Sequence, residues 1–177
     1  MFNRQLSLFL SDAGRAYAEC RRSGNQNKEN EMDDLKSSTA VCGIDCFNCE
    51  LFHTNIDSFF ENLSGDRKTA IVSRGLTKEK LRCKGCRISG CTLIPEKCET
   101  LECAKSKQVD FCFECSDFPC SKLQPLAEGA DRYPHNLKVY NLMVIKCKGL
   151  EKWASEATEI REKYFKGKFR IGSGPQK

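Results

Sequence analysis

Hydrophobic residues recur at helical spacing in the last third of the chain. Across residues 150–165 the apolar side chains return every three or four positions, which is the pattern of one buried helix face. The preceding segment has the same spacing and lies between Pro134 and Gly149, residues that favour a helix start and a helix end. We therefore predict two antiparallel helices that supply most of a modest apolar core.

The earlier part of the chain has shorter amphipathic segments, and strand signals are weak. Thr77 and Thr100 are placed to cap helices, and Pro119 suits a first helical turn. We predict helices at about 49–62, 66–74, 101–108 and 118–127, with a short capped turn after Thr77.

Polar residues gather at both ends of the chain. Residues 1–34 are predicted to form an N-terminal extension and linker, disordered or weakly helical. Residues 166–177 are predicted to be a flexible basic tail. The apolar run at residues 6–10 is too short for a signal peptide, and no run of about 18 apolar residues occurs. No membrane span is expected, and the cytoplasm is the expected location.

The cysteines change this picture. The 177-residue chain has 13 cysteines. Three pairs have the Cys-x-x-Cys spacing that lets two thiolates in a tight turn bind one tetrahedral metal ion. We predict a metal site formed by the cysteines between positions 42 and 120, namely Cys42, Cys46, Cys49, Cys83, Cys86, Cys91, Cys98, Cys103, Cys112, Cys115 and Cys120. The predicted fold class is therefore mainly α, a small helical domain over residues 35–165 with cysteine knuckles stapled by metal and little or no sheet.

Zinc is the expected cofactor, with two to three ions, because its structural sites are commonly built from paired cysteine knuckles. Disulfides are less expected, since the sequence has no export signal. We predict that Cys83 and Cys86 share an ion with Cys112 and Cys115. How the other cysteines divide among the metal ions stays open.

An iron–sulfur cluster is the alternative cofactor. The spacing Cys42-x3-Cys46-x2-Cys49 resembles the cluster motif of radical S-adenosylmethionine enzymes, but those enzymes need alternating strands and helices that this chain does not indicate. Thiolate ligands alone suit either cofactor. Two further residues are predicted to stay outside the site: His53 as a surface histidine and Cys147 as a packed core residue.

Charge argues against nucleic acid as a partner. The formal net charge is +5, with the cysteines counted as neutral. Each zinc ion bound by four thiolates removes two positive charges, so two such sites leave a net charge of about +1. Because the basic character then nearly vanishes, nucleic-acid binding is not expected.

The combined motifs resemble a known family. The matching segments are VCGIDCFNCELF, CKGC, CETLECAKSKQVDFCFECSDFPCSKL and YPHNLKVYNLMVIKCKGLEKW, which together span roughly residues 40–153. They are similar to the cysteine-rich proteins of domain-of-unknown-function family 3795. The resemblance implies a small helical protein with cysteine-coordinated metal, expected to be zinc, and it supplies no reaction.

Two classes of function are compatible with the sequence. The first is a metal-stabilised binding module whose surface serves a protein or small-molecule partner, and the absence of complete Ser-His-Asp, HExxH, P-loop or GxGxxG motifs favours it. The second is a redox or open-site metal enzyme that uses Cys42, Cys46 and Cys49. Polar residues beside the knuckles, such as Asp45 and Asp117, are interpreted as turn and cap residues.

Overall fold

The computed structural model describes residues 26–94 and 96–176. Within these residues it contains helices and two isolated β-bridges, with no strand or sheet, which confirms the predicted mainly-α fold class. The α-helices are α2 (Gln26–Ser37), α3 (Ile56–Glu61), α4 (Gly65–Ser73), α5 (Lys78–Leu81), α6 (Cys86–Ser89), α7 (Glu99–Ser106), α8 (Lys138–Lys148) and α9 (Leu150–Lys166). Short 3₁₀ turns are η1 (Cys46–Asn48), η2 (Cys112–Glu114), η3 (Ser121–Leu123) and η4 (His135–Leu137).

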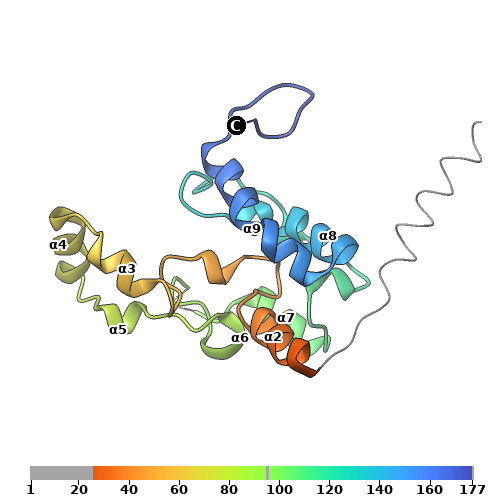
Figure 1. Cartoon of the computed structure of the whole chain (residues 1–177), viewed down its shortest axis with the longest axis horizontal. Coiled ribbons are helices and arrows are strands. Elements are labelled where there is room, and N and C mark those ends of the chain that lie inside the picture. The colour runs from red at the N-terminus through yellow and green to blue at the C-terminus, as the bar shows by residue number, and fades with distance from the viewer. Residues whose placement is uncertain (1–25, 95, 177) are drawn as a thin grey trace, which may run out of the picture.

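Helices α8 and α9 pack against each other and hold the main core (Figure 1). Gly149 joins them with a φ of +87°, a backbone conformation that favours glycine. Trp153 and Leu142 are fully buried at the centre of the main apolar cluster. The predicted pair of C-terminal helices is therefore confirmed.

The prediction that Cys147 packs in the core is wrong, because this residue is exposed. The buried face of α8 runs through Asn141, Leu142 and Ile145. Two residues beyond Ile145 correspond to about 200° around a helix, so position 147 faces away from the core.

Helices α3, α4 and α5 form an arm, residues 51–81, that extends to one end of the molecule (Figure 1). Its small apolar cluster contains Leu51, Ile56 and Leu81, and Cys83 completes it. The arm is closed at its base, where Cys83 N donates to Leu51 O at 2.9 Å and His53 N donates to Cys83 O at 2.8 Å. His53 is exposed, as predicted, and its ring lies 4.4 Å from that of Phe52.

Other predicted helices are shorter than expected or absent. Helix α4 and the short turn capped by Thr77 are confirmed, with Lys80 N donating to Thr77 Oγ1. Helix α7 begins one residue before Thr100, so this threonine is not its cap. The helix predicted at 118–127 is wrong: only η3 forms there, because Gln124 is extended before Pro125, as expected for a residue preceding proline.

Both ends of the described chain have local structure. Residues 1–25, including Cys20, lie outside the described residues. Residues 26–34, predicted to be disordered or weakly helical, belong to α2, and α2 contacts α9. After α9, Lys168 and Gln176 exchange two backbone hydrogen bonds, so the tail turns back on itself. Among the helices of the described residues, none has the length and apolar character needed to cross a bilayer.

Candidate metal centre

Two of the Cys-x-x-Cys pairs adopt the same backbone turn. In η1, Cys49 N donates to Cys46 O at 2.9 Å, and in η2, Cys115 N donates to Cys112 O at 3.2 Å. Both closing cysteines are extended, with φ and ψ of −77° and 135° at Cys49 and −76° and 139° at Cys115. Each turn thus carries two thiols on a tight, hydrogen-bonded knuckle, as expected for metal-ligating turns.

The third pair, Cys83 and Cys86, depends on Gly85. This glycine has a φ of +94°, and a Cβ there would lie 2.9 Å from the Ser37 carbonyl oxygen. Its N–H donates to Cys83 Sγ at 3.3 Å. A side chain at position 85 would therefore disturb the knuckle directly.

Six cysteines gather where the arm joins the rest of the molecule, and we call them the first cysteine group. Electrostatic interactions between their thiols link Cys49 to Cys83, Cys46 to Cys42, Cys83 and Cys86, and Cys91 to Cys49, Cys83 and Cys86. The group therefore consists of Cys42, Cys46, Cys49, Cys83, Cys86 and Cys91.

One hydrogen bond dominates the protonation of this group. The Cys46 thiol bonds to Cys86, which lowers the pKa of Cys86 to about 6 and raises the pKa of Cys46. Burial raises the pKa of Cys42 to about 12. Of these two thiols, negative charge is therefore favoured on Cys86 and disfavoured on Cys46.

Four cysteines line a cavity of about 140 Å³ on the other side of the knuckles, and we call them the second cysteine group. Cys103 comes from α7, Cys112 and Cys115 come from the η2 knuckle, and Cys120 precedes η3. Burial, followed by the charges of the other three cysteines, raises the pKa of Cys112 to about 11. These thiols thus lie close enough to act on one another.

Lys107 and Asp117 also line this cavity and both contact Cys115. Asp117 N donates to Cys115 Sγ at 3.4 Å, and Lys107 Nζ donates to it at 3.1 Å. These two hydrogen bonds, the backbone one first, lower the pKa of Cys115. Both hydrogen bonds therefore favour the thiolate form of Cys115.

The two cysteine pairs predicted to share one ion have different sets of nearby cysteines, although Cys42 interacts with both Cys86 and Cys112, and the sharing stays a prediction. Cys83 and Cys86 lie with Cys46 and Cys49, whereas Cys112 and Cys115 lie with Cys103 and Cys120. The reason is the backbone: the bonds between Leu51, His53 and Cys83 bring the second knuckle to the first. The two groups still adjoin, because Cys112 N donates to Val41 O at 2.9 Å. Cys98 packs between them against the apolar cluster that Cys86 and Cys112 also contact.

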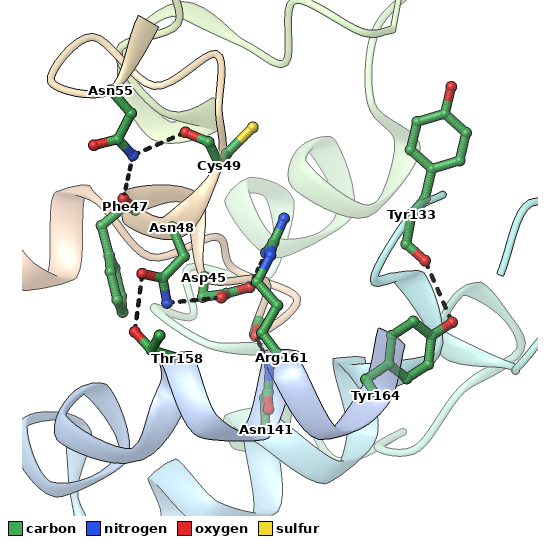
Figure 2. Close-up of polar contacts among 11 residues, drawn as sticks. Asp45, Phe47, Asn48, Cys49, Asn55, Tyr133, Asn141, Thr158, Arg161 and Tyr164 are labelled. Atoms are coloured by element: carbon green, nitrogen blue, oxygen red, sulfur yellow. Dashed lines mark hydrogen bonds and ion pairs between the residues drawn. The ribbon is translucent and has the colours of Figure 1, made fainter. Parts of the chain in front are cut away.

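The first knuckle is held against α8 and α9 by buried polar contacts (Figure 2). Arg161 Nη1 lies 2.6 Å from Asp45 Oδ1, and the side chains are 20% and 2% exposed. Asn48 donates to Asp45 at 3.0 Å and accepts from Thr158 at 3.2 Å. Burial raises the pKa of Asp45 even though Arg161 lowers it, so desolvation of this carboxylate outweighs the attraction.

Two asparagines complete the attachment of the knuckle (Figure 2). Asn141 Nδ2 donates to Gly43 O at 2.8 Å in the buried interior. Asn55 Nδ2 bridges two carbonyls of the knuckle, Phe47 O at 2.7 Å and Cys49 O at 2.9 Å. The ring of Phe47 meets the Trp153 indole edge-on at 5.7 Å. The knuckle is thus fixed from both sides before any metal is considered.

The sequence interpretation missed the residues that reach the knuckles from a distance. Asp45 and Asp117 are more than turn residues, since they pair with Arg161 and Lys107. No local motif in the sequence indicates these ion pairs, because Arg161 lies 116 residues from Asp45. Only the fold brings them together.

The donor chemistry of both groups fits a thiolate-bound metal, since zinc and iron–sulfur sites use cysteine sulfur. Among the described residues, no three cysteine, histidine or carboxylate groups are placed to hold one ion.

Comparison with known proteins places the chain in a family without assigning an activity. No curated protein and no solved structure matches this chain significantly. One family model matches residues 38–125, the segment that holds all eleven cysteines named above. The chain belongs through this segment to the family described as protein of unknown function (DUF3795).

Proposed function

We propose that this protein is a zinc-stapled binding module, in which metal ions bound by the two cysteine groups fix short helices into one surface. The observation that carries the proposal is the second cysteine group, because four cysteines from α7, η2 and the start of η3 line a single cavity. Four thiolates are a common ligand set of a structural zinc ion.

The first cysteine group supports a second ion. It has six cysteines, more than one tetrahedral ion requires, and Cys46, Cys49, Cys83 and Cys86 supply two complete knuckles. An ion there joins the arm to the first knuckle, and the first knuckle is already attached to α9 through Arg161. The two ions thus connect all the segments that carry little apolar core of their own.

The role of such a module is to present a rigid surface to a protein or small-molecule partner. Metal binding contributes about 10–16 kcal/mol in zinc-finger peptides, which is enough to order short helices that lack a large core. Metal binding requires reduced cysteines, and a reducing compartment such as the cytoplasm keeps cysteines reduced.

Elemental analysis tests the proposal. Protein purified without oxygen or chelator should contain at least two zinc ions per chain. The double variant Cys112→Ser/Cys115→Ser should lose one ion, because it removes two ligands of the second group and leaves the first intact. Cys147→Ser is the matched control: this cysteine is exposed on α8 outside both groups, so the metal content should stay unchanged.

Two results would contradict the proposal. A wild-type protein free of metal after anaerobic purification would exclude zinc binding by the two cysteine groups. A brown protein containing iron and acid-labile sulfide would replace zinc by an iron–sulfur cluster and favour the redox alternative.

A further inference from the structure

The Lys107 side chain lies at the cavity of the second cysteine group. It follows α7 directly, and its backbone N–H donates to Cys103 O at 3.1 Å. Its side chain reaches along the cavity to the other end of the group, where Nζ lies 3.1 Å from Cys115 Sγ. One residue therefore contacts two of the four cysteines that line the cavity.

Asp117 fixes the direction of the Lys107 side chain. Its carboxylate forms an ion pair with Nζ of Lys107, and its own backbone N–H donates to the same Cys115 sulfur at 3.4 Å. Ser116 Oγ donates to the other carboxylate oxygen at 3.3 Å. The ammonium of this exposed pair is thus directed toward the sulfur by a short loop.

The other lysine at this cavity is arranged differently. Lys122 lines the cavity, but its ammonium pairs with Glu99 at 3.0 Å, and no bond from it to a cysteine sulfur is among the described contacts. On α7, Lys105 pairs with Glu102 at 3.1 Å and does not line the cavity. Among these three lysines, a direct bond to sulfur is described for Lys107 alone.

Charge explains why such a contact matters. Four thiolates around a divalent ion leave a net charge of −2 in the cavity. An ammonium that hydrogen-bonds one of the sulfurs offsets part of this charge, and charge-assisted hydrogen bonds are about twice as strong as neutral ones. Groups that hydrogen-bond metal ligands typically change metal affinity by about 10–100-fold when they are removed.

We infer that Lys107, oriented by Asp117, is a positioning residue of the second metal site, where it holds Cys115 toward the ion and offsets the negative charge of the thiolates. This inference rests on the proposed zinc binding at the second cysteine group. It adds to that proposal a residue that no cysteine spacing identifies.

Competition for zinc with a chromophoric chelator tests the inference. Lys107→Met should release one zinc ion per chain at about a tenfold lower chelator concentration than the wild type. The other zinc should be released at the same chelator concentration as in the wild type, because no contact of Lys107 with the first cysteine group is described. Lys107→Arg keeps a cationic donor and should restore part of the affinity, and Asp117→Asn should give an intermediate loss.

Lys105→Met is the matched control, since it removes a lysine for which no contact with a sulfur is described, in the last turn of α7 and two residues before Lys107. Cobalt provides a second measurement: with Co²⁺ in place of zinc, the thiolate-to-metal charge-transfer band should shift in Lys107→Met and not in Lys105→Met. Far-UV circular dichroism should be equal for all metal-loaded variants.

The outcomes separate the two proposals. If the wild type binds no zinc, the proposed function itself fails. If zinc binds to the wild type and Lys107→Met releases it at the same chelator concentration, the role of Lys107 is excluded and the metal site stands. A Lys107→Met variant that loses all its zinc together would also overturn the inference, because the residue would then act through the fold.

Discussion

Gly43 is a residue at which the first knuckle approaches α8 closely. Its φ is +82°, and a Cβ there would lie 2.9 Å from Leu142 Cγ and 3.0 Å from Lys138 O. An alanine adds the strain of the left-handed conformation, roughly 1–2 kcal/mol, and an overpacking cost of about 1–3 kcal/mol. We predict that Gly43→Ala lowers the free energy of unfolding in urea by at least about 2 kcal/mol.

Gly75→Ala controls for the strain alone. Gly75 also has a positive φ, +67°, but nothing lies within 4 Å of its Cβ position. This variant should cost about 1 kcal/mol. Equal losses in the two variants would mean that close packing at Gly43 does not matter.

Arg161 is the second residue whose change has a defined expected result. Its loss leaves the Asp45 carboxylate buried without its cation, and breaking such a pair costs about 3–5 kcal/mol. Arg161→Met should therefore destabilise the protein by about this amount in chemical denaturation. Because burial raises the pKa of Asp45, the added change Asp45→Asn should restore part of the stability by removing the uncompensated charge.

The control for Arg161 is an ion pair on the exposed side of the same helix. Lys163 pairs with Glu159 at 3.0 Å with both side chains well exposed, so Lys163→Met should cost less than about 1 kcal/mol. A double variant of Asp45 and Arg161 that is no more stable than Arg161→Met would show that the buried charge is not the cause.

At the scale of elements, sequence periodicity predicted those helices whose own residues decide their form. Helices α8 and α9 follow from a regular apolar face between proline and glycine. The short turn α5 follows from the Thr77 cap. In contrast, the segment after Cys120 was predicted as a helix from Pro119, and Pro125 a few residues later ended it after one turn.

Cysteine spacing supplied eleven ligand candidates, because knuckles are local, and metal binding by these residues stays a prediction. Spacing did not supply the arrangement of the cysteines in space. The pairing of knuckles depends on the bridge between Phe52 and Cys83, and the contact of Lys107 with Cys115 depends on how α7 meets η2. Both are tertiary contacts that spacing along the chain does not encode.

The helix predicted at 49–62 forms only over Ile56–Glu61, as α3, and a turn between η1 and α3 takes the place of its first part. Asn55 is responsible, since its amide bridges the Phe47 and Cys49 carbonyls. Asn55→Ala leaves two part-buried carbonyls without this partner, at a cost of about 1–3 kcal/mol. We predict a matching decrease in thermal or urea stability. Asn62→Ala, which removes two exposed bonds to Ser58, should change stability far less; equal effects would exclude the bridge as the cause.

At the scale of the whole molecule, apolar packing is unevenly distributed. The cluster around Trp153 and Leu142 joins α8 and α9 to the knuckles. The arm has a smaller cluster around Ile56, and α4 has no buried residue. Since Cys83 belongs to both the arm cluster and the first cysteine group, stability of the arm should depend on metal more than that of α8 and α9 does.

Hydrogen exchange followed by mass spectrometry checks this dependence. On zinc removal by a chelator under reducing conditions, amides of α3, α4 and α5 should lose protection first, because loss of the ion frees the base of the arm at Cys83. Amides of α8 and α9 should keep most of their protection, since the apolar cluster of Trp153 and Leu142 joins the two helices directly and neither helix carries a candidate ligand, although Cys42, Cys112 and Cys120 pack against that cluster. The fluorescence of Trp153, the single tryptophan, should correspondingly change little at chelator concentrations that already open the arm. Simultaneous loss of protection in the arm and in α8 and α9 would show that metal supports the fold as one cooperative unit, and unchanged exchange throughout would show that the arm does not depend on metal.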